Sequence, residues 1–269
     1  MIRKAILGLA GLIWASQASA DWTVNMPRGV TELSAETYDL HMMVFWTCVF
    51  IGFVVFGVMI ISLIKHRKAA GATAANFSHS TTAEVIWTAI PCVILLLMAV
   101  PAAETLIKLD DSRDPDLSIV ITGYQWKWHY KYQDEGIEFY SSLALPSVRA
   151  RVRQSGIDPN SVDNYLRDVD RPLVVPRGEK VRILLTSRDV VHAWWVPELA
   201  IKKDAIPGII NETWFRAEKT GIYRGQCAEL CGKDHGYMPV VVEVVEPAAY
   251  QAWIETQTDD SARLARLEN

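Results

Sequence analysis

Two long stretches without charge constrain this chain more than any other feature. Residues 42–64 contain no charged side chain, and residues 85–103 contain none between Glu84 and Glu104. A helix crosses the hydrocarbon core of a membrane with about 20 apolar residues, so each stretch is long enough to span it. We therefore expect a helical hairpin with two membrane spans, at about 42–64 and 85–107, within an N-terminal region that covers 21–109.

The first 20 residues have the pattern of a secretory signal. Arg3 and Lys4 form a positive start, a short apolar core follows, and Ala18-Ser19-Ala20 fits a cleavage site of small residues. The core is too short to span a membrane, which favours cleavage over the alternative of an uncleaved anchor. We predict a signal peptide at 1–20 and a mature chain that begins near Asp21.

The charges beside the spans predict the topology. The loop between the spans carries Lys65, Arg67 and Lys68, and it contains no acidic residue before Glu84. Because basic loops stay in the cytoplasm, we expect both chain ends on the outer side of the membrane. The formal charge of the whole chain is −4. This acidic balance argues against nucleic acid as a partner.

Beyond residue 110 the sequence is typical of a water-soluble all-β domain. Short runs rich in β-branched and aromatic residues alternate with Gly, Pro, Asp and Asn, which favours a small Greek-key sandwich or barrel. The clearest runs are 117–132, 172–175, 180–186, 212–217, 221–224 and 238–246. We expect the domain to cover 110–255, with a surface loop at 147–170, a short helix at 247–254 and a tail at 256–269.

One short segment concentrates metal ligands. It contains Cys227, Cys231, His235 and Met238 within twelve residues, and His192 lies 35 residues before the first of them. Thiolates and a thioether are soft ligands, and together with imidazole they favour copper. The sequence therefore predicts a copper site in the β domain.

The second cysteine permits a site with two metals. Two thiolates can each bridge two copper ions, which leaves one imidazole for each metal, while Met238 and the backbone carbonyl of Glu229 act as weaker ligands. Zinc is one alternative, but it does not need a methionine. A disulfide between Cys227 and Cys231 is the plainer alternative in an exported domain, and the nearby histidines and methionine argue against it.

Three motifs resemble cytochrome c oxidase subunit II. They are HAWWVP at 192–197, KKDAIPG at 202–208 and GQCAELCGKDHGYMP at 225–239. The resemblance runs from about residue 30 to about residue 255, and it weakens in 140–170 and in the tail. It implies a cupredoxin-like β-barrel that holds two copper ions. The implied ligands are His192, Cys227, Glu229 through its carbonyl, Cys231, His235 and Met238.

The resemblance also implies a function. Such a subunit accepts electrons from cytochrome c and passes them to the haem centres of subunit I, where oxygen is reduced to water with coupled proton pumping. The implied partners are subunit I, other oxidase subunits, cytochrome c and membrane lipid. The implied location is the inner membrane of a bacterium, with the copper domain in the periplasm.

The resemblance also implies roles for three further residues. Trp126 matches an electron-entry tryptophan, although alternation along 124–132 also fits a strand that faces the core. Glu84 matches the entrance of a proton path into subunit I, although an acid at a helix end is often only solvated. The side chain of Glu229 matches a ligand of a magnesium or manganese ion shared with subunit I.

An acidic surface is the last feature that the resemblance implies. Asp134, Glu135 and Asp189 match the acids that receive the basic face of cytochrome c. Arg188 departs from the pattern, because relatives often carry an acid at that position. A solvated face without a partner is the alternative for these acids.

Other classes of protein fit the sequence less well. A quinol oxidase subunit II shares the spans and the barrel but lacks the copper ligands. A membrane-anchored copper delivery factor with a C-x-x-x-C pair needs neither Met238 nor the aromatic run. A nitrous oxide reductase needs a large additional domain, and the absence of C-x-x-C-H excludes a covalently attached c-type haem.

Overall fold

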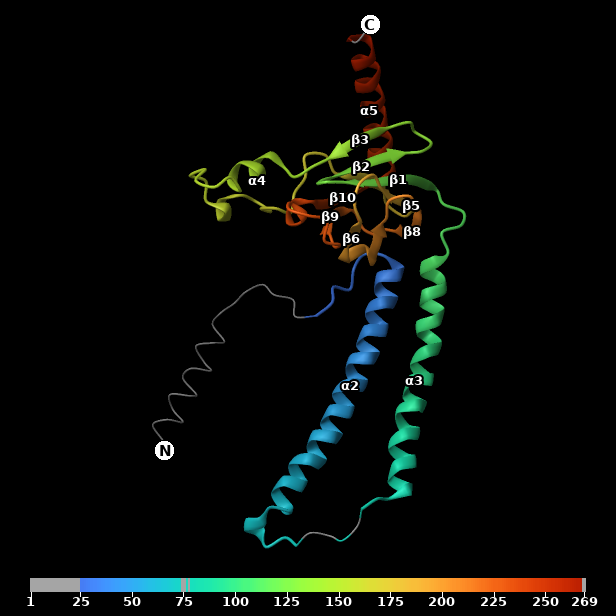
Figure 1. Ribbon diagram of the computed structural model, residues 1–269. Coiled ribbons are helices and arrows are strands. Elements are labelled where there is room, and N and C mark those ends of the chain that lie inside the picture. Colours follow the sequence, from blue (N-terminus) through green and yellow to red (C-terminus); the bar gives the residue numbers. More distant parts are fainter. Residues whose placement is uncertain (1–24, 74–75, 77, 268–269) are drawn as a thin grey trace.

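The computed structural model describes residues 25–73, 76 and 78–267. Two long helices, α2 (Glu32–Lys65) and α3 (Thr81–Asp110), extend from one side of a β domain (Figure 1). The helices approach each other beside the domain, where Lys108 Nζ lies 2.5 Å from a carboxylate oxygen of Glu36. The predicted hairpin is confirmed, whereas the predicted signal peptide at 1–20 lies outside the described residues.

Both helices are longer than the predicted spans because their caps lie outside the apolar stretches. Thr31 caps α2 by accepting a 2.9 Å hydrogen bond from the Ser34 amide, and the Ser34 side chain accepts one from the Thr31 amide. Ser80 caps α3 through a 3.4 Å bond from Ala83. The polar first turns of each helix therefore extend the spans at their N-terminal ends.

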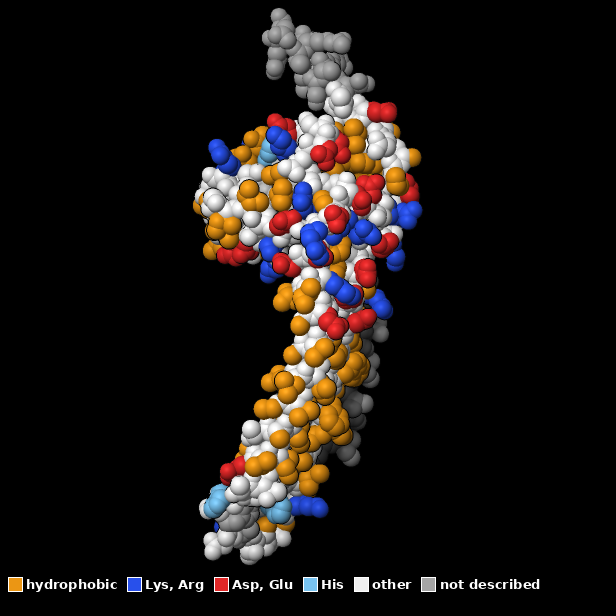
Figure 2. All heavy atoms as spheres, turned by 90° about the vertical axis from the view of Figure 1, so that its right-hand side faces the viewer, with side chains coloured by type: hydrophobic (Ala, Val, Ile, Leu, Met, Phe, Trp, Pro, Cys, Tyr) orange, Lys and Arg blue, Asp and Glu red, His pale blue; other side chains and the backbone are white. Residues whose placement is uncertain are grey.

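The surface of the hairpin is apolar. Side chains such as Phe53 and Leu97 are 79% and 70% exposed, and both helices are long and apolar enough to cross a membrane. Figure 2 shows hydrophobic side chains along the length of the hairpin and mixed charges where it meets the domain. An exposed apolar surface of this extent is unfavourable in water and matches a lipid environment.

The β domain consists of two five-stranded sheets. The first has the order β3 (Glu138–Ser141), β2 (Lys127–Tyr132), β1 (Leu117–Tyr124), β5 (Lys180–Ser187) and β8 (Asn211–Arg216). The second has the order β4 (Leu173–Pro176), β10 (Pro239–Val245), β9 (Gly221–Cys227), β6 (His192–Val196) and β7 (Ile201–Ala205). The β1–β5 and β10–β4 pairs are parallel and the other pairs are antiparallel. The predicted all-β domain is confirmed.

The core lies between the sheets and follows strand alternation. In β5, Val181, Ile183 and Leu185 are fully buried, while the residues between them are partly exposed. Fully burying such a side chain stabilises the fold by about 1.5–3 kcal/mol. Trp128 from the first sheet and Trp194 from the second are the largest fully buried side chains.

The prediction of an aromatic, core-facing strand along 124–132 is confirmed for Trp128, Tyr130 and Tyr132, which are fully buried, and is wrong for Tyr124 and Trp126. Residues 125 and 126 form a turn between β1 and β2, and the register pairs Tyr124 with Lys127. Tyr124 therefore lies on the outer face with Lys127, whereas Trp128 belongs to the buried face. Trp126 is in the turn itself, half-buried. Alternation along one continuous strand would place Tyr124 and Trp128 on the same face. The two-residue turn instead places Tyr124 on the same face as Lys127.

Two segments contain more helix than predicted. The expected short helix and tail form one helix, α5 (Pro247–Leu267), whose Trp253 packs 5.2 Å from the ring of Tyr132. The expected surface loop contains α4 (Leu145–Ala150) and the short 3-10 helix η2 (Pro159–Ser161). We call residues 142–170 the flap. Its base is closed by the isolated bridge between Leu143 and Val169.

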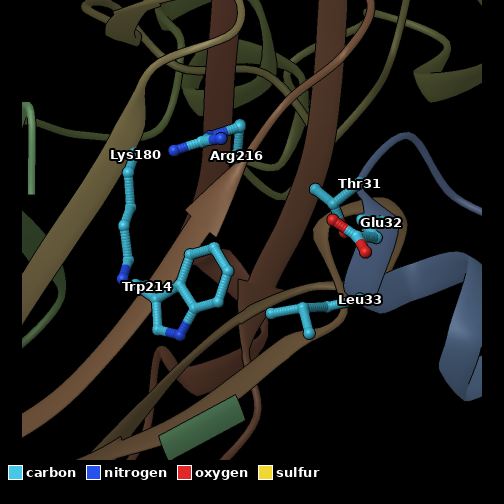
Figure 3. Close-up of a pocket in the computed structure, with 6 residues that line it drawn as sticks. All are labelled: Thr31, Glu32, Leu33, Lys180, Trp214 and Arg216. Carbon is cyan, nitrogen blue, oxygen red and sulfur yellow. The ribbon is translucent and has the colours of Figure 1, made fainter. Parts of the chain in front are cut away.

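Hydrogen bonds fasten the domain to the tops of both helices. On the α2 side, the Val30 amide donates to Glu198 O at 2.9 Å. On the α3 side, Trp214 Nε1 donates to Lys108 O at 3.0 Å, and Lys180 Nζ donates to Asp111 O at 2.9 Å. A small pocket at this junction is shown in Figure 3 and is lined by Thr31, Glu32, Leu33, Lys180, Trp214 and Arg216. These bonds set the position of the domain above the hairpin.

The close contact between β6 and β9 yields a test of the fold. A Cβ on Gly225 would lie 1.7 Å from the Trp195 carbonyl oxygen, and neither backbone can move without breaking the sheet. We expect Gly225→Ala to lower the free energy of unfolding by about 3 kcal/mol or more. Thermal and urea unfolding measure the loss. Gly236→Ala is the control, because nothing lies within 4 Å of its added carbon, and equal stability of the two variants would contradict this packing.

Candidate metal centre

The predicted metal ligands come together at one end of the second sheet. His192 begins β6 and Cys227 ends β9, and the two strands pair with Trp194 opposite Cys227. The Cys227 amide donates a 2.9 Å hydrogen bond to Met238 O, which holds the end of the ligand segment next to its start. His235 begins the 3-10 helix η4 (His235–Tyr237) between them.

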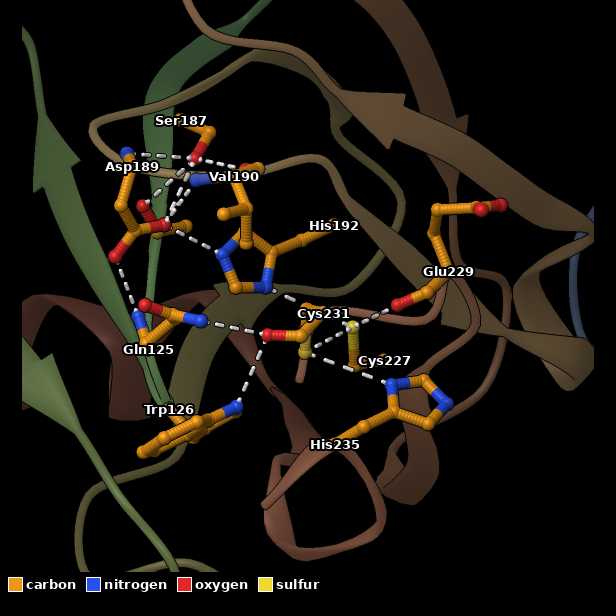
Figure 4. Close-up of polar contacts among 11 residues, drawn as sticks. Gln125, Trp126, Ser187, Asp189, Val190, His192, Cys227, Glu229, Cys231 and His235 are labelled. Atoms are coloured by element: carbon orange, nitrogen blue, oxygen red, sulfur yellow. Dashed lines mark hydrogen bonds and ion pairs between the residues drawn. The ribbon is translucent and has the colours of Figure 1, made fainter. Parts of the chain in front are cut away.

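Two sulfur atoms lie between two imidazole nitrogens at short range in this site (Figure 4). The sulfur atoms of Cys227 and Cys231 are 3.8 Å apart. His192 Nδ1 lies 3.8 Å from the first sulfur, and His235 Nδ1 lies 3.5 Å from the second. The carbonyl oxygen of Glu229 lies 3.4 Å from Cys227 Sγ. Each imidazole therefore turns one ring nitrogen toward one sulfur.

The site is closed to solvent. His192, Cys227, Cys231 and Met238 are each at most 3% exposed. His235 is half-buried, and it lies on the side of the site nearest the surface. The Met238 side chain is buried in the same core cluster as the two cysteines. Burial excludes water from the donor atoms and leaves them available to a metal.

The donor set fits a soft metal ion. Both cysteines are free thiols, and a metal–thiolate bond is about 2.3 Å long, so one ion reaches both sulfurs across 3.8 Å. The ligand atoms of His192, Cys227 and Cys231 all lie within 4.8 Å of one another. Thiolates combined with imidazole, and with a thioether nearby, fit copper better than magnesium or calcium.

The two thiols have opposite pKa shifts. Burial alone would raise the pKa of Cys227, but contacts from His192 and from backbone amides lower it to about 7. Burial and the neighbouring Cys227 thiolate raise the pKa of Cys231 to about 12. Metal binding displaces the protons that the thiols still hold.

Asp189 supports the ligand His192 from behind. One carboxylate oxygen lies 2.8 Å from His192 Nε2, the ring nitrogen that faces away from the cysteine. The backbone amides of Gln125 and Val190 each donate a 2.7 Å hydrogen bond to the same carboxylate. Burial opposes ionisation, but these bonds lower the pKa of Asp189, and the contacts with Cys227 and Asp189 raise the pKa of His192 despite its burial.

Gly123 makes room for the same ring. A Cβ at this position of β1 would lie 2.8 Å from His192 Cδ2, closer than real contacts allow. Sequence analysis missed this role and the role of Asp189 as a partner of His192. A carboxylate three residues before a ligand histidine was the available signal, since such pairs commonly orient metal ligands.

Trp126 is linked directly to the site. Its Nε1 donates a 3.2 Å hydrogen bond to the carbonyl oxygen of Cys231, and Gln125 Nε2 donates a 2.8 Å bond to the same oxygen (Figure 4). A Cβ on Gly232 would lie 3.3 Å from the indole ring, so this part of the ligand segment passes close beneath it. The half-buried tryptophan thus connects the domain surface to the backbone of a cysteine of the site.

Two predicted residues lie away from the sulfurs. The side chain of Glu229 is exposed and points away from them, so that only its carbonyl faces the site (Figure 4). Glu84 is exposed in the first turn of α3, at the end of the hairpin that is far from the β domain (Figure 1).

The acids that were predicted to receive cytochrome c lie at two ends of β2. Asp134 and Glu135 follow β2 at its C-terminal end, whereas Trp126 precedes its N-terminal end. Glu135 also accepts a 3.4 Å hydrogen bond from Tyr250 of α5. Asp189 lies beside the Trp126 turn, but its carboxylate is occupied by the donors described above. The docking surface for cytochrome c therefore stays a prediction, with its acids placed at both ends of the strand.

Comparisons with known proteins agree with the fold and the donor set. A family model described as cytochrome c oxidase subunit II, transmembrane domain, matches residues 19–105, and one for the periplasmic domain of the same subunit matches residues 117–245. The chain is 34% identical over 265 residues to a probable cytochrome c oxidase subunit 2 of Rickettsia bellii, covering 96% of this chain and 95% of the relative.

Two further similarities extend this result. The cytochrome c oxidase subunit 2 of Cereibacter sphaeroides is 33% identical over 271 residues, covering 92% of this chain and 88% of the relative. The crystal structure of the periplasmic domain of cytochrome oxidase subunit II from Bradyrhizobium japonicum is 41% identical. It covers 55% of this chain and 98% of its own, with a TM-score of 0.48.

The fold and the site together define a class: a membrane-anchored, cupredoxin-like domain with a copper site built from two thiols and two imidazoles. The chain belongs to the cytochrome c oxidase subunit II family, whose members are subunits of haem–copper terminal oxidases. The resemblance found in the sequence is thereby confirmed. The family binds copper, and its members work together with other oxidase subunits.

The contact between Asp189 and His192 predicts a measurable effect on metal binding. Asp189→Asn keeps the size of the side chain but removes the charge that orients the ring, so we expect about 10- to 100-fold weaker copper binding with little change in fold. Competition with a chelator of known affinity measures the loss. Asp134→Asn is the matched control at the far end of β2, and equal affinity of both variants would exclude the supporting role.

Proposed function

We propose that this chain is the electron-entry subunit of a cytochrome c oxidase. Its copper centre accepts electrons from cytochrome c and passes them to the haem centres of subunit I, where oxygen is reduced to water with coupled proton pumping. One observation carries the proposal. Two buried cysteine sulfurs lie 3.8 Å apart, each has an imidazole nitrogen within 3.5–3.8 Å, and a half-buried tryptophan donates to the carbonyl of one of these cysteines.

The proposed copper centre holds two ions. Its ligands are His192, Cys227, the carbonyl of Glu229, Cys231, His235 and Met238. Two copper ions held by these residues would supply an electron carrier whose charge is spread over both metals. The protein keeps water out by burying the sulfurs, and it holds the rings in place through Asp189 and the loop hydrogen bonds.

Trp126 is the proposed point of electron entry. The indole is partly exposed, and a single hydrogen bond separates it from the backbone of Cys231. Gln125 donates to the same carbonyl and so keeps the turn against the ligand segment. This pair of bonds leaves little freedom for the ring, which favours transfer because the distance to the copper ligand stays constant.

Glu229 is proposed to serve two partners at once. Its carbonyl faces the sulfurs, and its exposed carboxylate points the other way (Figure 4). Carboxylate oxygens suit magnesium and manganese, which are hard ions. We assign this side chain to a magnesium or manganese ion shared with subunit I, so that the copper site would lie beside the haem-bearing subunit.

The proposed location is the inner membrane of a bacterium, with lipid around the hairpin and the copper domain in the periplasm. The basic loop between the helices supports this orientation. The corresponding division is a signal peptide at 1–20, a hairpin region at 21–109, a copper domain at 110–255 and a C-terminal segment at 256–269. Glu84 then lies at the cytoplasmic end of α3, where we propose that it opens a proton path into subunit I.

The two thiols should be needed together. We expect Cys227→Ser and Cys231→Ser each to abolish the electron paramagnetic resonance signal of a mixed-valence copper pair, because one thiolate cannot bridge both ions in the same way. Copper content per chain should also fall below two. Cys48→Ser and Cys92→Ser are the controls, since both of these thiols are exposed on the hairpin. A normal two-copper signal in either of the first two variants would refute the assignment.

Trp126 should act in transfer and not in folding. We expect Trp126→Gln to retain copper and stability but to slow reduction of the copper centre by cytochrome c at least about tenfold in stopped-flow absorbance. Trp195→Phe is the control, because that indole is also half-buried but belongs to the second sheet. Reduction of the Trp126 variant at the unaltered rate would place electron entry elsewhere.

A further inference from the structure

The two histidines of the metal centre are held in different ways. His192 is buried, and the Asp189 carboxylate lies 2.8 Å from the ring nitrogen that faces away from the sulfur. His235 is half-buried, and its Nδ1 lies 3.5 Å from Cys231 Sγ (Figure 4). Within the described part of the chain, the His235 ring has no other hydrogen-bond partner. The position of this imidazole therefore depends on the backbone that carries it.

That backbone is a single helical turn, η4, of three residues. Two hydrogen bonds fasten it within the ligand segment. The His235 amide donates to Gly232 O at 3.2 Å, and the Tyr237 amide donates to Asp234 O at 2.9 Å. Gly236 faces open space, because nothing lies within 4 Å of an added Cβ. A helix of one turn gains little stability from its own hydrogen bonds, so contacts from elsewhere must hold η4 in place.

Arg151 of the flap contacts residues on both sides of His235. One of its guanidinium nitrogens lies 3.2 Å from a carboxylate oxygen of Asp234, and its guanidinium carbon lies 4.2 Å from the centre of the Tyr237 ring. The side chains of Arg151 and Asp234 are 29% and 19% exposed, so solvent screens this ion pair less than a fully exposed one. A planar guanidinium can pair through its edge and stack through its face. We call Arg151, Asp234 and Tyr237 the η4 clamp.

The flap in turn holds Arg151 in place. Arg151 directly follows α4, and its amide donates a 3.0 Å hydrogen bond to Ser147 O. Ser147 is buried, and its hydroxyl accepts a 3.0 Å bond from the Leu166 amide in the other arm of the flap. At the base of the flap, Asp168 lies 3.6 Å from a guanidinium nitrogen of Arg224 in β9. The η4 clamp therefore rests on a support that is bonded to the second sheet.

We propose that Arg151 is a positioning residue for the copper ligand His235, and that it supports this ligand as Asp189 supports His192. The proposal rests on the proposed function, in which His235 binds copper. Arg151 acts through the backbone of η4, whereas Asp189 contacts the ring itself. Because His235 is the more exposed of the two rings, fixing it closes the side of the site from which a metal ion can be lost. Partners that orient metal ligands commonly change metal affinity about 10- to 100-fold.

Hydrogen exchange in the metal-free full chain in detergent tests the η4 clamp without copper. Arg151→Met removes the charge and the planar group but keeps an unbranched side chain. We expect the amides of residues 233–238 to exchange about threefold faster or more, while those of β6 and β9 stay protected. Arg149→Met is the matched control, because Arg149 lies two residues earlier in the flap, is exposed, and forms no ion pair among the described residues. Equal exchange in the two variants would overturn the proposal.

Copper affinity tests the effect on the site. In competition with a chelator of known affinity, we expect Arg151→Met to bind copper about 10- to 100-fold more weakly, because the His235 ring is no longer held. Arg151→Lys keeps the charge but cannot pair and stack at once, so its affinity should lie between those of Arg151→Met and the unaltered chain. An affinity of Arg151→Met equal to that of Arg149→Met would contradict the positioning role, even if η4 exchanged faster.

Spectroscopy of the copper-loaded chain shows which ring has moved. Electron nuclear double resonance resolves the nitrogen coupling of each imidazole that binds the copper centre. We expect Arg151→Met to change one of the two couplings, and Asp189→Asn to change the other. A general loss of structure would change both couplings together, so this pattern separates positioning from a merely structural role. Two unaltered couplings in Arg151→Met would overturn the proposal.

The outcomes separate this proposal from the proposed function. If the unaltered copper-loaded chain shows the nitrogen coupling of only one imidazole, His235 is not a ligand, and the ligand assignment fails together with the proposal. If the unaltered chain shows two couplings and Arg151→Met behaves as Arg149→Met does, the positioning role of Arg151 fails while the ligand assignment stands.

Discussion

The close approach of β6 and β9 is the contact on which the rest of the site depends. Gly225 lies against the Trp195 carbonyl, and this allows the strands to pair with Trp194 opposite Cys227. His192 and Cys227 are far apart in the sequence, yet this register brings the imidazole nitrogen within 3.8 Å of the sulfur. A larger residue at 225 would push apart the two strands that carry these ligands.

A carboxylate couples the metal site to the surface. Asp189 faces His192 on one side and accepts the Gln125 amide on the other, and Gln125 in turn donates to the Cys231 carbonyl. The ring, the turn and the ligand segment therefore share one network of hydrogen bonds. Such a network is stable when every member is satisfied, and it holds the candidate ligands and Trp126 at a constant separation.

Local features of the sequence predicted much of this protein. The two spans and the soft ligands at 225–239 follow from hydropathy and ligand chemistry, which depend on neighbouring residues alone. The turn at 125–126 could not be predicted in this way, because the choice of face depends on pairing between β1 and β2. The roles of Gly123 and Asp189 depend on contacts with His192, from a separate strand and from the loop before it, and they become visible only in three dimensions.

The local surface charge, like the turn at 125–126, cannot be predicted from neighbouring residues alone. The chain has a formal charge of −4, and that total favours a basic partner. In the fold, Asp189 contacts His192, Asp234 pairs with Arg151, and Asp134 lies at the far end of a strand from Trp126. Lys127 lies over the Tyr140 ring, and Arg188 and Lys233 are exposed without an ion pair among the described residues. Since screening leaves only nearby charges effective, the sign that a partner meets is set by how the fold pairs its acids and not by their number.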